Sequence, residues 1–199
     1  MPGRSGRKEP KGEAMNGRTL NGISALVILV ALASPAAAEE RVCRGTIGDT
    51  TVDNLRVPQN ATCRLNGTKV KGTVKVERNA KLFAQDVVVI GNVQGENAAQ
   101  VNVTDGSRVG GSVQVVQGGG AVIADSRVNA DILYDEQDKK VKVLRSRIGG
   151  SVQAFQNDGG VAIRGNTIDG NLQCKANNPA PVGGNNIVGG NKEDQCKNL

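Results

Sequence analysis

Apolar and polar residues alternate in short runs from Val52 to Gly190, and these runs recur every 19 or 20 residues. Clear copies are Val89-Ile-Gly91-Asn-Val93 and Val109-Gly-Gly111-Ser-Val113. Alternation with a period of two indicates β-strands, and the Gly, Asn, Asp and Ser residues between the runs are typical of turns. The pattern predicts two or three short strands in each repeat.

Residues one repeat apart have the same character and therefore form columns along the chain. Two of these columns are apolar: Leu82, Val101, Ala121, Val141 and Val161, and Ala84, Val103, Ile123, Val143 and Ile163. A repeat this short cannot bury its apolar face alone, so neighbouring repeats must stack. We predict an all-β, right-handed parallel β-helix (a β-solenoid) of about seven to eight coils of 19–20 residues. A left-handed hexapeptide helix, with about 18 residues per coil, is the alternative that fits the period less well.

The four cysteines follow the same period. Cys43 and Cys63 are 20 residues apart, and Cys174 and Cys196 are 22 residues apart. Strands stacked in neighbouring coils bring such residues within the Cα–Cα range of a disulfide. We therefore expect the bonds Cys43–Cys63 and Cys174–Cys196, each joining an end coil to its neighbour.

The Val-x-Gly-x-Val pattern at this spacing resembles the coils of right-handed parallel β-helix proteins. It is most similar to the short aliphatic coils of bactofilins, the polymer-forming cytoskeletal proteins of bacteria. The resemblance extends from Val52 to about Gly190 and implies the solenoid fold. Bactofilins are cytosolic, whereas this chain begins with an export pattern.

Residues 15–38 resemble a secretory signal peptide. A positive charge at Arg18 precedes an apolar run from Ile23 to Ala33, and small residues stand just before Glu39. An uncleaved amphipathic anchor is the alternative. We expect export to the periplasm or outside the cell, with no transmembrane segment in the mature form. The expected organisation is an extension and signal peptide (1–38), an N-terminal cap coil (39–54), β-helix repeats (55–174), and an irregular loop with a C-terminal cap coil (175–199).

Composition excludes several kinds of site. The chain has no His, which rules out His-dependent catalytic triads and His-ligated zinc. Its formal net charge is +6, but residues 1–38 hold five of the 25 basic residues and two of the 19 acidic ones. The remaining basic residues form no run, so nucleic acid is not expected as a partner.

Two sets of polar residues are candidate sites. The first is an outward row of glutamines in register, interrupted by Lys75 and Leu133 at the equivalent places: Gln94, Gln114, Gln153 and Gln173. Ser112 and Ser151 belong to the row beside it. Stacked amides can hydrogen-bond to one another along the rod. Alternatively, this face binds a glycan or another surface.

The second set is Asp86, Asp105 and Asp125, in register and followed by Arg145. Turn chemistry closed by an ion pair is one interpretation, and a Ca²⁺ site is the other, because hard cations prefer clustered oxygen ligands. No cofactor is expected apart from Ca²⁺ at this row.

These features predict an exported, non-catalytic β-helix module with a structural, adhesive or cell-surface interaction role, without catalytic residues. Its expected partner is a cell-surface glycan or protein, and the oligomeric state stays open. The alternative is a polysaccharide-binding protein, or a polysaccharide lyase-like enzyme on the same fold, that uses the aspartate row or the Gln and Ser face.

Overall fold

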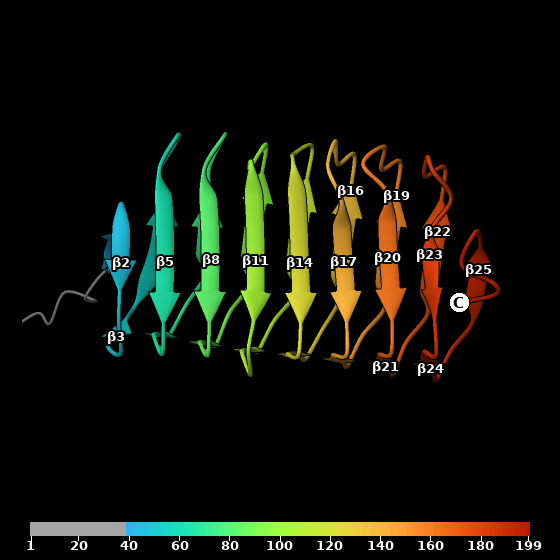
Figure 1. The fold of residues 1–199 in the computed structure, drawn as a ribbon. Coiled ribbons are helices and arrows are strands. Elements are labelled where there is room, and N and C mark those ends of the chain that lie inside the picture. The colour runs from blue at the N-terminus through green and yellow to red at the C-terminus, as the bar shows by residue number, and fades with distance from the viewer. Residues whose placement is uncertain (1–38) are drawn as a thin grey trace, which may run out of the picture. The chain divides into compact units, whose positions relative to one another are not determined.

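The computed structural model describes residues 39–199, and these residues form a β-solenoid of about eight turns (Figure 1). Every strand pairing within this range is parallel, and the range contains no helix. Each turn adds one strand to each of three sheets, here named A, B and C. The all-β parallel solenoid predicted from the repeat is therefore confirmed.

Sheet A has nine strands: β1 (Glu40–Val42), β4 (Asn54–Val57), β7 (Val74–Val76), β10 (Val93–Glu96), β13 (Val113–Val116), β16 (Ile132–Asp135), β19 (Val152–Phe155), β22 (Leu172–Lys175) and β25 (Lys192–Asp194). Sheet B has eight: β2 (Gly45–Ile47), β5 (Thr62–Asn66), β8 (Lys81–Gln85), β11 (Gln100–Thr104), β14 (Gly120–Ala124), β17 (Val141–Leu144), β20 (Val161–Arg164) and β23 (Val182–Gly184). Sheet C has eight two-residue strands: β3 (Thr51–Val52), β6 (Lys69–Val70), β9 (Val88–Val89), β12 (Arg108–Val109), β15 (Arg127–Val128), β18 (Arg147–Ile148), β21 (Thr167–Ile168) and β24 (Ile187–Val188).

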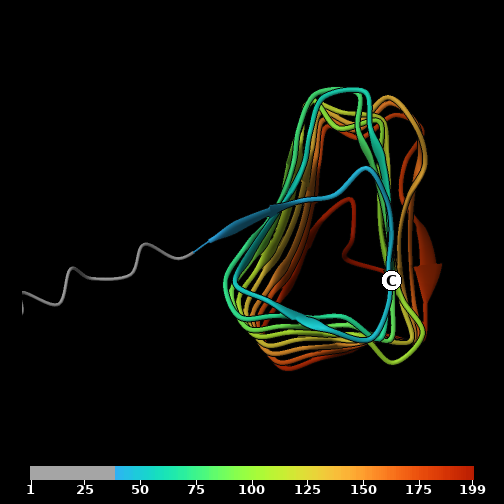
Figure 2. The ribbon, with the colours of Figure 1, turned by 90° about the vertical axis from the view of Figure 1, so that its left-hand side faces the viewer.

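The strand register reproduces the sequence period. Val93 pairs with Val74 in the preceding turn and with Val113 in the following one. In Figure 1 the strands of sheet B run downward in front and those of sheet A run upward behind, while the chain advances to the right. Seen from the N-terminal end, the chain therefore winds clockwise away from the viewer, around a three-sided cross-section (Figure 2). This winding is right-handed, as predicted.

The inward columns form a continuous aliphatic core along the axis. The ten residues of the two predicted apolar columns are all buried. Tyr134 is also fully buried, between Val115 and Ala154 of the neighbouring turns, and its hydroxyl donates to the carbonyl of Lys142 at 3.3 Å. Because Ala154 in the next turn has only a methyl side chain, one aromatic ring fits inside the narrow prism.

Both predicted disulfides are present. Cys43 and Cys63 have a Cα–Cα distance of 5.5 Å, and Cys174 and Cys196 one of 5.2 Å. Both distances lie in the normal range for this bond. The bonds join the end turns to their neighbours and indicate an oxidising, exported environment.

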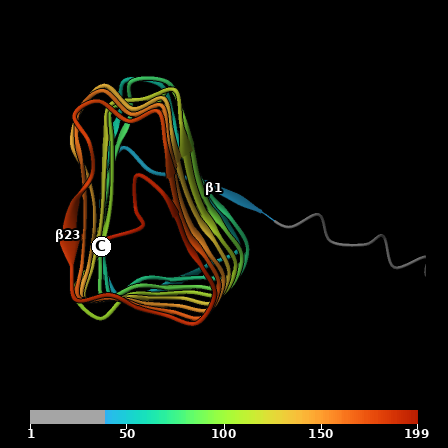
Figure 3. The same ribbon diagram turned by 90° about the vertical axis from the view of Figure 1, so that its right-hand side faces the viewer.

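The C-terminal part contains both an irregular connection and a last turn of the solenoid. Residues 176–181 connect two strands irregularly, but β23, β24 and β25 then extend all three sheets, and the last turn closes the rod in Figure 3. The predicted signal peptide lies outside the described residues. No helix within residues 39–199 is long and apolar enough to cross a membrane.

Candidate functional site

The predicted glutamine row lies on the outer face of sheet A. Gln153 Nε2 donates to Gln173 Oε1 at 2.9 Å, and Gln173 Nε2 donates to Glu193 Oε2 at 2.8 Å. Gln94 and Gln114 pair in register and are both exposed, without a side-chain hydrogen bond between them in the described part of the chain. One amide–amide bond, Gln153–Gln173, is therefore present in the row, and Glu193 accepts the next bond in the last turn.

Ser112 and Ser151 belong to a ladder that ties neighbouring turns together at the corner between sheets C and A. The hydroxyl of Ser112 accepts from the backbone N–H of Asp131 at 3.3 Å, and that of Ser151 accepts from the N–H of Asn171 at 3.0 Å. The N–H of Ser112 in turn donates to Asn92 Oδ1 at 2.8 Å. Both serines are half-buried and already bonded within the fold.

The same corner explains the glycine of the repeat. A Cβ at Gly91 would lie 2.7 Å from the carbonyl oxygen of Gly72, one turn before it. Successive turns approach too closely for a side chain at Gly91, whereas Ala130 at the equivalent position shows that one turn accommodates a methyl group. The glycine is thus required by contact between turns rather than by a left-handed backbone.

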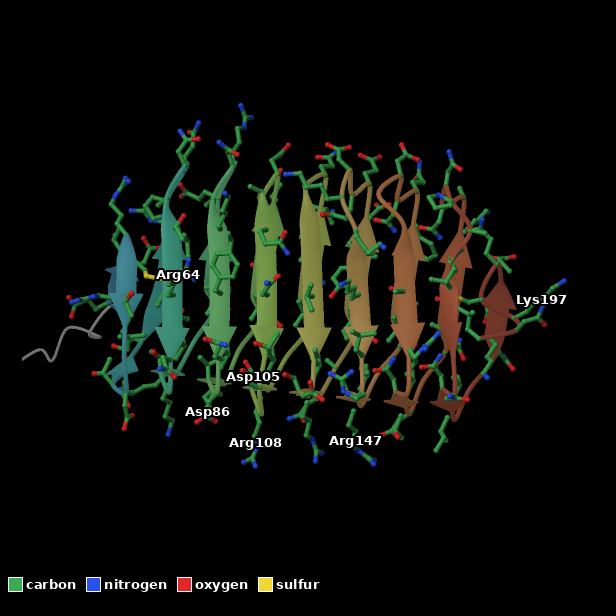
Figure 4. All side chains as sticks on the ribbon, viewed as in Figure 1. Arg64, Asp86, Asp105, Arg108, Arg147 and Lys197 are labelled. Carbon is green, nitrogen blue, oxygen red and sulfur yellow. A yellow bond between two sulfur atoms is a disulfide. The ribbon has the colours of Figure 1, made fainter. Side chains whose placement is uncertain are left out.

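The three aspartates lie in one row at the corner between sheets B and C. Asp86, Asp105 and Asp125 all have a left-handed backbone, with φ of 50°, 57° and 51°. Asp and Asn tolerate this conformation better than other residues with a side chain. Figure 4 shows Asp86 and Asp105 side by side along this edge of the molecule.

Two of these carboxylates are already bonded. Asp105 accepts from Gln85 Nε2 at 2.8 Å and from Thr104 Oγ1 at 3.0 Å. Asp125 accepts from Arg145 Nε and Nη2 at 2.7 and 2.6 Å. These hydrogen bonds and the charge of Arg145 hold the pKa of Asp125 below its usual value despite some desolvation.

Within residues 39–199, no group of three or more His, Cys, Asp or Glu is placed to hold a metal ion. The Ca²⁺ hypothesis for the aspartate row stays a prediction.

An arginine row on the outer face of sheet C was not anticipated. Arg108, Arg127 and Arg147 begin the consecutive strands β12, β15 and β18, pair in register, and are all exposed. Neighbouring strands in a sheet lie about 4.8 Å apart, so the row repeats a positive charge at about that spacing. Figure 4 shows Arg108 and Arg147 extending outward from the same edge. We call these three residues the arginine ladder.

The ladder lines a groove with a volume of about 880 Å³. Its lining includes the three ladder arginines and Arg145 against a single acidic residue, Asp125. Val88 and Ile90 contribute exposed apolar surface at one end of the groove. The groove is therefore cationic with an apolar border.

The cations of this groove are unequally neutralised. Arg145 is held by Asp125, and Arg147 Nη2 lies 3.2 Å from Asp169 Oδ2. Arg127 Nε donates only to the neutral Asn129 Oδ1, at 3.0 Å. Arg108 makes neither an ion pair nor a side-chain hydrogen bond with any residue from 39 to 199. Arg108 and Arg127, which are adjacent in the ladder, thus lack a counter-charge among residues 39–199.

The sequence does carry a signal for this ladder. Three Ser-Arg-aliphatic triplets occur one repeat apart, at 107–109, 126–128 and 146–148. In each, the strand alternation buries the serine and the aliphatic residue and exposes the arginine. A search for basic runs misses the ladder, because stacked residues are 19 or 20 positions apart.

No family model, curated protein or solved structure matches the chain significantly. The resemblance to bactofilins therefore stays an expectation from the repeat pattern. The chemistry open to the groove is the binding of anions by guanidinium groups, which pair with carboxylate, sulfate or phosphate oxygens through two parallel hydrogen bonds.

Proposed function

We propose that residues 39–199 form an exported, non-catalytic module with a structural, adhesive or cell-surface interaction role. The observation that carries this proposal is the stack of turns, closed by a disulfide at each end, that presents in-register rows of side chains on three sheet faces. Such a scaffold repeats similar side chains at the spacing of one turn. A repeating surface of this kind suits an extended or repetitive partner, in the periplasm or outside the cell.

The test is to determine in which cell fraction the full chain is found in the cells that produce it. Cells making the protein with a C-terminal epitope tag are fractionated by osmotic shock at low ionic strength. We expect the protein to stay with the envelope. Release together with a soluble periplasmic marker, or accumulation in the medium without binding to cells, would contradict the proposal.

The second candidate is polysaccharide binding, which the cationic groove over sheet C favours. A lyase-like activity is distinguished from binding by incubating the protein with polygalacturonate, with and without added Ca²⁺, and assaying for unsaturated sugar products. We expect none. Product formation that Asp105→Ala abolishes would replace the non-catalytic proposal with an enzyme.

A further inference from the structure

We infer that the groove over sheet C binds a linear acidic polysaccharide whose carboxylates pair with the arginine ladder. The inference rests on the proposed function and names its ligand class. The ladder supplies Arg108, Arg127 and Arg147 from three consecutive turns of one rigid sheet. A ligand that repeats its charge along a chain can follow this row, whereas a single small anion can engage only part of it.

Charge is the first argument. Like charges placed directly opposite one another on neighbouring strands destabilise a sheet. Here Arg108 and Arg127 are register partners, and neither has an acidic partner in the described residues. The nearby acidic groups are engaged elsewhere: Asp125 pairs with Arg145, Asp169 pairs with Arg147, and Asp105 accepts from Gln85 and Thr104 of sheet B. Asp86, which lies at the same corner one turn before Arg108, makes no ion pair or side-chain hydrogen bond within residues 39–199. A bound polyanion would remove the repulsion between the two arginines.

The shape and border of the groove are the second argument. The groove follows consecutive turns, so an extended chain can lie along it. Ile90 is 54% exposed and Val88 is 37% exposed at its border. The C–H faces of sugar rings can pack on such aliphatic side chains without an aromatic platform.

The groove lacks the features expected for single-stranded nucleic acid. Proteins that bind single strands usually stack the bases on aromatic rings. The described aromatic residues are elsewhere: Tyr134 is buried, Phe155 is on sheet A, and Phe83 on sheet B lies under the guanidinium of Arg64 at 4.7 Å. Carboxylates on a sugar chain therefore fit the groove better than a nucleic acid does.

The experiment measures binding of the folded, oxidised protein to immobilised polygalacturonate at low and moderate salt. The ladder variant replaces the three ladder arginines and leaves Arg145 and Asp125 in place: Arg108→Gln, Arg127→Gln and Arg147→Gln. A matched variant removes the same number of positive charges from exposed positions on sheets A and B: Lys75→Gln, Lys81→Gln and Arg164→Gln. Circular dichroism and thermal unfolding establish that both variants keep the wild-type fold.

We expect saturable binding by the wild-type protein that weakens with salt. The ladder variant should bind about tenfold more weakly or worse, because three charge-assisted contacts are lost together, and the matched variant should stay close to wild type. An equal loss in both variants would show general attraction to a polyanion and overturn the inference. Absence of binding at low salt, or tighter binding to single-stranded DNA or to anionic lipid vesicles, would also overturn it.

Failure of this inference can be distinguished from failure of the proposed function. If the ladder variant fractionates with the envelope as the wild-type protein does and polygalacturonate is not bound, the inference fails and the proposed function stands. If the wild-type protein is released on osmotic shock, the proposed function fails whatever the groove binds.

Discussion

Two neighbouring residues of β13 show how sharply each strand separates inside from outside. Val113 is completely buried among aliphatic side chains, whereas Gln114 is exposed on sheet A. Val113→Asp would bury a carboxylate without a partner and should lower the free energy of unfolding by about 3 kcal/mol or more. Gln114→Ala should lower it by less than about 1 kcal/mol. Urea titration of both variants tests this difference, and equal effects would contradict the inside–outside assignment.

Asp135 is a residue whose charge opposes folding. Its Oδ1 is buried without a hydrogen bond, and desolvation together with the charge of Glu136 raises the pKa of its carboxyl, only partly offset by a hydrogen bond from the Glu136 backbone. The folded state therefore binds this proton more tightly than the unfolded state does. The penalty is absent below the ordinary pKa of an aspartate and grows as pH rises through the higher folded-state value.

Asp135→Asn should therefore raise the free energy of unfolding at pH 7 and lose this advantage near pH 3, below the ordinary value of about 3.9. Urea titrations at both pH values measure the change. Asp138→Asn removes a nearby exposed charge and serves as the control. An advantage for Asp135→Asn that is equal at the two pH values would show that its cause is not ionisation.

At the scale of the turns, buried asparagine and serine side chains join one coil to the next. Asn166 Nδ2 donates to the carbonyl of Val143 at 2.8 Å and to Asn186 Oδ1 at 3.0 Å, and its Oδ1 accepts from the N–H of Ser146 at 2.9 Å. Each bond crosses to another turn, so the corner is held by side chains as well as by the strand ladders.

Asn166→Leu would leave the buried N–H of Ser146 without an acceptor and should destabilise the protein by about 1–3 kcal/mol. Asn166→Ser is the matched variant, because serine occupies the same column at Ser126 and Ser146 and accepts the equivalent bond at 3.2 Å from Ser126 N–H to Ser146 Oγ. The loss of unfolding free energy should be clearly smaller in Asn166→Ser than in Asn166→Leu. Thermal unfolding compares the two variants, and a serine variant as unstable as the leucine one would mean that side-chain size, not the hydrogen bond, matters here.

The solenoid was predictable from the sequence because its period fixes both strand register and core. Leu82 and Val101 needed only their 19-residue separation to be placed in one column, and the cysteine pairs followed from the same spacing. The buried asparagines were not predictable, because an Asn between two strand runs, such as Asn166, is typical of an exposed turn. The arginine ladder was missed because charges adjacent in space are far apart in sequence.

At the scale of the molecule, the end turns have only one neighbouring turn and are held by disulfides. In a stack of repeats, the terminal repeat lacks half of the contacts of an inner one. Replacing Cys174 and Cys196 by Ser should therefore loosen β25 while leaving the central turns intact. Hydrogen exchange read by mass spectrometry should show lost protection at Lys192–Asp194 and unchanged protection in β13. A uniform loss of protection along the chain would mean that the Cys174–Cys196 disulfide stabilises the whole stack rather than its end.

The same ends decide whether the molecule polymerises. β1 and β25 are the edges of sheet A, and an unpaired strand edge can recruit another chain. Both edges carry charges, at Glu40 and Arg41 and at Lys192, Glu193 and Asp194, and charged side chains on an edge oppose such pairing. We expect the oxidised protein to be monomeric or a small oligomer in light scattering coupled to size-exclusion chromatography, with no filaments in electron micrographs.

The variant without Cys174 and Cys196 should form larger species, because fraying of the last turn exposes the edge of β22 that normally pairs with β25. Filaments of the oxidised, intact protein would show that the charged edges do pair, and would favour a polymer-forming role of the bactofilin kind over a discrete surface module.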